Sequence, residues 1–255
     1  MPVRPEWKRR VEAKIKPYGK AKWTDVAIEK VREAAAGREG ITVLDVGCGI
    51  DSWIIRTIRE TCPSPRVIGV DVDPDCVKNP DVDVAHLASA EDMPLESGSV
   101  DLVLSAWVAE HLENPVAAIR EMNRVLKPGG AIIFWTPNLY NPAMLVSKCT
   151  PRWFHTWSRR LSHGADHAEN APTYYRMNTI RGIKELALGS GLVCEYIRAF
   201  SSGYQYFGMS KPTYVAACLL NKLAVVWPLS CLRLTLLCVI RKPELLIPQR
   251  TGREK

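Results

Sequence analysis

Short apolar blocks recur along the chain, and most are followed by glycine, proline or acidic residues. The first block, ITVLDV at 41–46, is continuously apolar apart from one aspartate, as in a strand buried on both faces of a sheet. On this pattern we predict strands at 41–46, 66–72, 82–87, 100–106, 131–137, 192–200 and 234–242.

The segments between the early strands have the apolar spacing of helices. In residues 52–61, Ile54, Ile55 and Ile58 share one face, and a proline follows the segment. Similar patterns predict helices at 22–36, 115–126 and 179–189. Strands that alternate with helices favour an α/β fold around a mostly parallel sheet.

Two segments interrupt this alternation. Residues 137–178 are irregular and rich in aromatic residues, histidines and prolines. Residues 201–232 are strongly apolar, but Asn221, Lys222 and Pro228 break them into pieces too short for a membrane-spanning helix. We therefore expect two insertions in the α/β framework, and the second could lie in a membrane interface.

Composition is ordinary for a globular protein of 255 residues, with 47% hydrophobic and 24% charged residues, and it excludes a disordered or fibrous chain. The net charge of +7 is unevenly spread: it is +5 over 1–40, −8 over 41–128 and +10 over 129–255. This pattern fits either solvated surface or a basic rim that faces an anionic substrate, a membrane surface or RNA. Eight cysteines without a C-x-x-C pair, and a polar start without an apolar signal core, predict reduced thiols in the cytoplasm.

The first chemical motif is VLDVGCGID at 43–51, where a strand ends in a glycine-rich loop that opens a helix. Glycines let the backbone turn sharply and approach a ligand closely. The carboxylate of Asp45 suits a ligand with an ammonium group and would repel a pyrophosphate. Asp51 and Ser52 stand where a dinucleotide-binding loop needs neutral residues and a third glycine, which argues against a nicotinamide cofactor.

A second acidic residue, Asp71, ends the next strand, 22 residues beyond Gly49. A carboxylate at this position can accept hydrogen bonds from both hydroxyls of a ribose. The alternative is that Asp71 caps a helix begun by DVDPD. In the following loop, ASAEDMP at 88–94, Asp92 can accept from an adenine amine and Met93 offers an apolar face to the ring.

The strand at 100–106 leads into a further motif, SAWVAEH, at the edge of the sheet where ligands bind in such folds. Glu110 and His111 follow within about one turn of the end of this motif's strand. A histidine can act as a general base near neutral pH, although a structural role is equally compatible with this sequence.

Together these motifs resemble class I S-adenosylmethionine-dependent methyltransferases, in particular the small-molecule branch related to ubiquinone and menaquinone biosynthesis. The resemblance runs from about 41 to 136, and LKPGG at 126–130 is a further hallmark of the family. It implies an α/β, Rossmann-like three-layer sandwich with a seven-stranded sheet whose last strand is antiparallel. It also implies S-adenosyl-L-methionine as the cofactor and one domain over 1–255, in which a basic helical segment at 1–40 precedes a cofactor-binding core at 41–136.

The resemblance also implies roles for individual residues. The methionine half of the cofactor would be lined by Asp45, Gly47, Cys48 and Gly49. The ribose would lie against Asp71 and Val72, the adenine against Glu91, Asp92 and Met93, and the sulfonium against Ser105, Ala106 and Trp107. Two departures matter. Ile50 and Asp51 stand where the family usually continues with another glycine, and Trp107 stands where some relatives carry a metal-binding glutamate, so we expect no metal site.

Methyl transfer from a sulfonium needs alignment and exclusion of water more than it needs a dedicated base. If a base acts, His111 beside Glu110 is our first choice; the alternates from the first insertion are His155, His163 and His167. This insertion is predicted to be a substrate lid, or else a satellite core, built from Trp153, Phe154, Trp157, Tyr174 and Tyr175.

Residues 201–232, flanked by basic side chains, suit a lipid-like or quinone-like acceptor or peripheral membrane contact. The alternatives are a helix packed on the sheet and a homo-oligomer interface. We expect a small-molecule acceptor and no nucleic-acid partner, because no aromatic and basic residues interleave as in an RNA platform. An RNA or protein methyltransferase, a nicotinamide dehydrogenase and a non-catalytic binding module are the competing functions.

Overall fold

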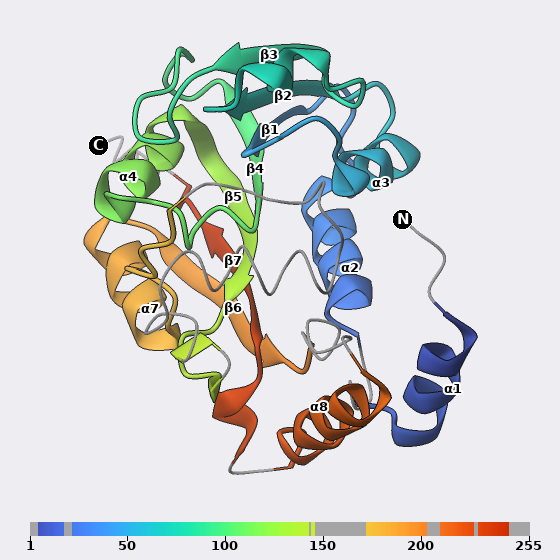
Figure 1. Ribbon diagram of the computed structural model, residues 1–255. Coiled ribbons are helices and arrows are strands. Elements are labelled where there is room, and N and C mark those ends of the chain that lie inside the picture. Colours follow the sequence, from blue (N-terminus) through green and yellow to red (C-terminus); the bar gives the residue numbers. More distant parts are fainter. Residues whose placement is uncertain are drawn as a thin grey trace, which may run out of the picture.

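Seven strands form one mixed sheet in the computed structural model, which describes residues 5–17, 22–142, 144–145, 172–202, 210–226 and 229–244 (Figure 1). In chain order they are β1 (Thr42–Val46), β2 (Arg66–Asp71), β3 (Val84–Leu87), β4 (Val100–Ala106), β5 (Leu126–Pro137), β6 (Val193–Phe200) and β7 (Thr235–Arg241). Their order across the sheet is β3-β2-β1-β4-β5-β7-β6. β7 runs antiparallel to both of its neighbours, as predicted for the last strand.

Helices cover both faces of the sheet and complete the predicted three-layer architecture (Figure 1). The described α-helices are α1 (Glu6–Ile15), α2 (Trp23–Ala35), α3 (Trp53–Thr61), α4 (Pro115–Val125), α7 (Ile180–Gly189) and α8 (Lys211–Leu223). Two short 3₁₀ helices accompany them, η1 (Pro74–Lys78) and η4 (Leu229–Leu232).

The strands contribute alternate residues to two separate cores. Leu44 of β1 packs in the core beneath α4 and α7, whereas its neighbour Val43 packs in the core beneath α2 and α3. Both side chains have no exposed surface. This burial on both faces explains why the central strands are continuously apolar in the sequence.

β5 starts five residues earlier than we predicted, because the LKPGG segment belongs to the strand. Leu126 already pairs with Val100, and an irregularity in register follows. A Cβ on Gly130 would lie 2.8 Å from the side chain of Leu126 and 3.0 Å from the carbonyl of Asp101, so the second glycine allows close packing there.

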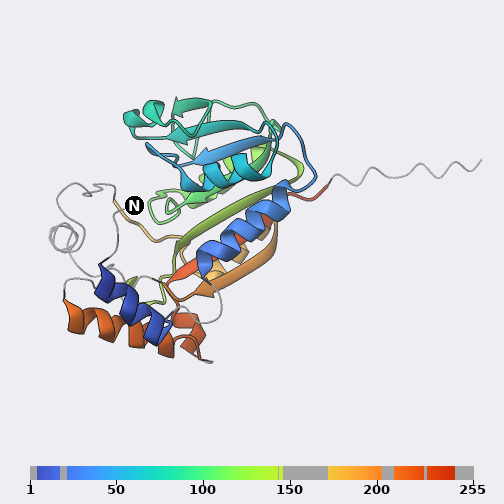
Figure 2. The ribbon, with the colours of Figure 1, turned by 90° about the vertical axis from the view of Figure 1, so that its right-hand side faces the viewer.

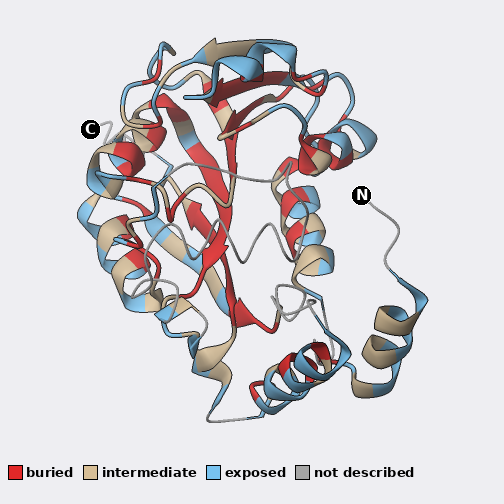
Figure 3. Cartoon of the chain, in the orientation of Figure 1, coloured by how far each residue is buried: buried red, intermediate tan, exposed pale blue. Residues whose placement is uncertain are grey.

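The α1–α8 unit, which comprises the two helices α1 and α8, lies apart from the two main cores (Figure 2). Its own small core is formed by Tyr214, Ala217 and Cys218 of α8, with Trp7, Val11 and Ile15 of α1 packed against them. Figure 3 shows that buried positions concentrate on the sheet and on the helix faces against it, and α1 has no buried residue. The alternative of an apolar helix packed on the sheet is therefore wrong: the inner face of α8 packs on α1.

Candidate active site

The loop after β1 lies at the carboxyl edge of the parallel strands, and it is held against the end of β2. The backbone amide of Gly47 donates to the carbonyl of Val70 at 2.7 Å. Gly47 and Gly49 have positive φ angles of 78° and 51°, which side chains rarely allow. A Cβ on Gly47 would lie 2.1 Å from Val108, so the loop after β4 packs directly on this glycine.

Two residues that the sequence analysis missed brace this loop from beneath. The side-chain amide of Asn79 donates to the carbonyls of Cys48 at 2.8 Å and Gly49 at 3.2 Å. Asp81 accepts from the backbone amide of Ser52 at 2.7 Å and from the guanidinium of Arg56 at 2.5 Å. Both braces are buried, and they follow η1, so only the folded chain brings them to the loop.

Asp45 is the most unusual charged group of the site, because its side chain is only 2% exposed. One carboxylate oxygen, Oδ2, has no hydrogen-bond partner. Burial raises the pKa of this carboxyl from 3.8 to about 6; the Ser52 hydroxyl opposes the rise, and the charges of Asp71 and Asp81 add to it. Ser52 precedes α3 but does not cap it with its side chain. The arrangement leaves a buried negative group that a cationic partner would stabilise.

Asp71 joins the glycine loop to the end of β2. Its Oδ2 accepts from the backbone amide of Gly49 at 2.8 Å, and its Oδ1 accepts from the amide of Asp73 at 2.9 Å. The capping alternative is wrong for this residue, because Asp73 caps η1. Val72, the neighbour predicted to lie beside the ribose, is 71% exposed.

The loop predicted to flank adenine is only partly open. The carboxylate of Glu91 accepts from the backbone amide of Asn114 at 2.8 Å, at the start of α4, and Asp92 is exposed. Met93 is 2% exposed and packs in the core, and its expected contact with the adenine stays a prediction.

The end of β4 places Ser105, Ala106 and Trp107 at the same edge as Asp45. Ser105 is buried, and Trp107 has a positive φ of 59°, a strained conformation for a bulky residue. Its backbone amide donates to the carbonyl of Trp135 at 3.0 Å, which fixes this turn to β5.

Trp107 belongs to a tryptophan cluster that sequence reasoning did not find; its members are Trp23, Trp53, Trp107 and Trp135. Trp23 lies at the centre, with ring centroids 6.1 Å from Trp53, 5.6 Å from Trp107 and 5.6 Å from Trp135. Trp135 is fully buried and its indole nitrogen has no hydrogen-bond partner, whereas the other three are half-buried. The cluster therefore forms an aromatic wall beside the turn after β4.

Glu110 and His111 have different surroundings. Glu110 is buried and accepts from the hydroxyl of Thr136 at 2.9 Å, while its backbone carbonyl accepts from the amide of Tyr174 at 2.7 Å. His111 is half-buried, with Nδ1 2.8 Å from the carbonyl of Pro172. Because a carbonyl only accepts, Nδ1 carries the proton, and Nε2 is left as the basic nitrogen of the neutral ring.

Most of the predicted lid falls outside the described residues, including Trp153, Phe154 and Trp157 and the histidines His155, His163 and His167. Tyr174 and Tyr175 are described: the guanidinium of Arg176 lies 5.1 Å from the Tyr174 ring centroid, and Tyr175 is buried. Within the described part of the chain, no group of three metal-ligating side chains could hold an ion.

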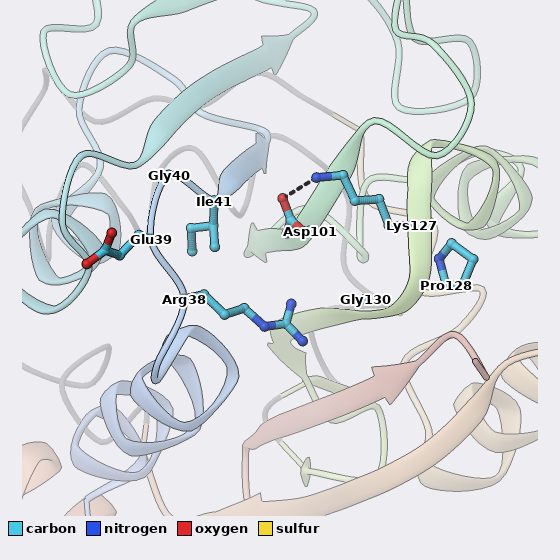
Figure 4. Close-up of a pocket in the computed structure, with 8 residues that line it drawn as sticks. All are labelled: Arg38, Glu39, Gly40, Ile41, Asp101, Lys127, Pro128 and Gly130. Atoms are coloured by element: carbon cyan, nitrogen blue, oxygen red, sulfur yellow. Dashed lines mark hydrogen bonds and ion pairs between the residues drawn. The ribbon is translucent and has the colours of Figure 1, made fainter. Parts of the chain in front are cut away.

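A cavity of about 440 Å³ lies elsewhere, at the amino ends of β1 and β4 (Figure 4). Asp101 and Lys127 point toward each other across it and form an ion pair of 2.7 Å. Asp101 also accepts from the backbone amide of Thr42 at 2.9 Å. These polar groups already satisfy one another, and the cavity is at the opposite edge from the glycine loop, so we assign no reaction to it.

Comparison with known proteins gives the class of this site. Residues 44–134 match the family described as "Methyltransferase domain". A protein of Mycolicibacterium smegmatis, named as a probable S-adenosylmethionine-dependent methyltransferase, is 36% identical over 119 residues, which are 45% of this chain and 44% of that protein. The demethylmenaquinone methyltransferase of Staphylococcus carnosus is 30% identical over 112 residues, which are 41% of this chain and 46% of that protein.

A solved structure extends the likeness to the whole fold. The geranyl diphosphate C-methyltransferase of Streptomyces coelicolor superposes with a TM-score of 0.58 at 14% identity, over 95% of this chain and 86% of that chain. The fold is thus that of Rossmann-like methyltransferases. Over residues 44–134 the chain matches the methyltransferase domain family, and the same region is similar to S-adenosylmethionine-dependent methyltransferases. The matched region spans less than half the length of these two curated relatives.

Among the described residues, no helix combines the length and apolarity needed to cross a membrane.

Proposed function

We propose that this chain binds S-adenosyl-L-methionine and transfers its methyl group to a small-molecule, lipid-like or quinone-like acceptor. The observation that carries the proposal is the unpaired, buried carboxylate oxygen of Asp45 beneath a glycine loop. An ammonium group there would pair with a carboxylate that the free protein leaves uncompensated. When bound, the cofactor supplies an electrophilic methyl group on a sulfonium.

The proposed roles follow the placement of the residues. Asp45 holds the ammonium group, and the backbone of Gly47, Cys48 and Gly49 lines the methionine half. Asp71 accepts from the ribose hydroxyls, since a carboxylate that receives two backbone amides still has free lone pairs. Further contacts would come from Val72 at the ribose, Glu91 and Asp92 at the adenine, and Ser105, Ala106 and Trp107 at the sulfonium; Met93 supports the adenine loop from the core.

His111 is the proposed general base where the acceptor must lose a proton, and its Nε2 is the nitrogen available for this step. Glu110 is a positioning residue in this proposal. It is buried, its carboxylate accepts from the Thr136 hydroxyl, and its backbone carbonyl accepts from the amide of Tyr174, close to the segment that contacts His111. We expect His111→Ala to lower turnover while leaving cofactor affinity unchanged, as measured by turnover assay and calorimetry. A parallel loss of cofactor affinity would make the histidine structural.

The acceptor class rests on the surfaces around the site. The tryptophan cluster offers an apolar wall that suits a ring or an isoprenoid chain better than a charged macromolecule. Two of the similar proteins are named for lipid-like acceptors, demethylmenaquinone and geranyl diphosphate. In this arrangement, 41–136 holds the cofactor, 137–178 acts as the lid and 201–232 as the apolar insertion, after the basic segment 1–40, all in one domain over 1–255.

Calorimetric titration of the protein with S-adenosylmethionine, and separately with NADH, tests the proposal. We expect micromolar binding of the first and none of the second, because the acidic loop repels a pyrophosphate. The Asp45→Asn variant is the control that should lose the binding. Binding of NADH, or binding of neither ligand by a folded protein, would refute the assignment.

A further inference from the structure

The outer face of α8 is apolar although it is exposed to solvent. Leu219, Leu220 and Leu223 are 50%, 66% and 56% exposed, and Ala216 lies with them. At 100° per residue, these positions lie opposite Tyr214 and Cys218, which face α1. A helix that is apolar on both faces is normally buried on both, so this surface is suited to a partner.

The charged residues of α8 are both basic. They are Lys211 and Lys222, and the chain contains no aspartate or glutamate from Tyr196 to Pro243. Residues 5–16, which include α1, carry five basic and two acidic residues. One of the two, Glu12, accepts a hydrogen bond from the hydroxyl of Tyr214 inside the unit. The surface thus combines exposed leucines with a basic surround.

The topology puts the α1–α8 unit at the same edge of the sheet as the glycine loop. The insertion leaves β6 at Phe200 and enters β7 at Thr235. Thr235 pairs with Phe200 on one side and, on the other, with Pro137 at the carboxyl end of β5. The side chain of Asn138, just past β5, donates to the carbonyls of Cys231 and Arg233 at 2.8 Å each. The insertion is therefore fastened to the chain that leaves the candidate active site.

We infer that the α1–α8 unit docks on an anionic lipid bilayer. Leu219, Leu220 and Leu223 enter the boundary between headgroups and acyl chains, and the lysines of α8 contact lipid phosphates. Docking at this edge brings the candidate active site to the surface from which a lipid-like acceptor would come. The inference goes beyond methyl transfer and does not depend on it.

A second copy of the chain fits this face less well. In a two-fold symmetric dimer the same patch meets itself, so the lysines of the two α8 helices would approach one another, and α8 carries no carboxylate to compensate them. A bilayer rich in anionic lipid supplies the missing negative charge and the apolar phase together.

Co-sedimentation of the full chain with phosphatidylcholine vesicles, with or without phosphatidylglycerol, tests the inference. We expect binding to the anionic vesicles that weakens as salt rises. Leu220→Ser should lower the partition coefficient about tenfold, whereas Leu188→Ser on α7, where the leucine is 79% exposed, should not change it. Replacing Lys211 and Lys222 by glutamate should lower it roughly tenfold or more, unlike the control pair Arg32→Glu and Lys184→Glu.

Three results would overturn the inference. The first is binding that is equal for Leu220→Ser and Leu188→Ser. The second is that the natural protein does not bind vesicles but forms a dimer in light scattering, and that Leu220→Ser dissociates this dimer. That result would make this face a subunit interface. The third is equal retention by single-stranded RNA and by anionic vesicles. Calorimetry with S-adenosylmethionine on the same variants separates this test from the proposed function, because Leu220→Ser should bind the cofactor normally.

Discussion

The glycine loop and the α1–α8 unit lie at one edge of the same sheet, but different forces hold them. The loop is fixed by directional hydrogen bonds from Asn79, Asp81 and Asp71 to named backbone groups. The α1–α8 unit is held by apolar packing, an edge-to-face contact between Trp7 and Tyr214, and a hydrogen bond from Tyr214 to Glu12. A site that binds a small ligand needs backbone groups fixed in position by hydrogen bonds, whereas a docking surface needs apolar area and charge.

The strongest test of this contrast is Asp45→Asn. The substitution removes the charge that we assign to the cofactor's ammonium group and leaves the shape of the side chain. We expect cofactor affinity to fall by about 2–5 kcal/mol, the usual loss when one partner of a buried charge pair is removed. Isothermal titration calorimetry at pH 7.5 measures it, and unchanged affinity would remove Asp45 from the site.

The same variant should be more stable than the natural protein when no cofactor is present. Folding raises the pKa of Asp45 from 3.8 to about 6, so the folded state binds the proton more tightly and stability falls as pH rises through this window. The advantage of Asp45→Asn should therefore be absent near pH 4 and reach up to about 3 kcal/mol above pH 6. Urea unfolding at both pH values tests the sign.

Gly47→Ala should act through packing. The new Cβ would lie 2.1 Å from Val108, and the φ of 78° is unfavourable for alanine. We expect a loss of about 3 kcal/mol in the free energy of unfolding, with cofactor binding impaired as the loop shifts. Gly49→Ala is the matched control, because a Cβ at this position would meet no other atom within 4 Å. We expect this variant to lose only about 1 kcal/mol in the free energy of unfolding, from backbone strain. Equal losses in urea unfolding would show that the contact with Val108 is unimportant.

Asp71→Ala should weaken cofactor binding by about 1.5–3 kcal/mol, because charge-assisted hydrogen bonds to the ribose are lost. It also releases the amides of Gly49 and Asp73, so we expect Asp71→Asn, which keeps one acceptor oxygen, to lose less. Calorimetry of both variants separates the two contributions. Normal affinity in Asp71→Ala would assign the residue to the loop alone.

Tyr214→Phe should have the smallest effect, and it probes the other side of the comparison. Loss of the hydrogen bond to Glu12 should lower the free energy of unfolding by about 1 kcal/mol, with no change in cofactor affinity. Thermal unfolding and calorimetry on the same sample measure both. A change in cofactor affinity would show that the α1–α8 unit and the glycine loop are energetically coupled.

The sequence predicted the features that depend on neighbouring residues. The strands and the loop after β1 follow from local apolar runs and glycine spacing, whereas the antiparallel direction of the last strand was implied by the family resemblance. Features that depend on distant residues were missed. Nothing near Asn79 or Asp81 indicates that they brace a loop some 30 residues earlier, and the four tryptophans are separated by at least 28 residues. The burial of Met93 was not foreseen either, because its core includes residues of α4, which comes later in the chain.

Cys48 lies inside the loop proposed to hold an alkylating cofactor, and a thiolate there would compete for the methyl group. Burial, together with the charges of Asp45 and Asp71, raises the pKa of this thiol to about 12. At neutral pH only roughly one thiol in a hundred thousand is then ionised, and the neutral thiol is a poor nucleophile. The carboxylates that would attract the cofactor thus also protect the loop from methylating itself.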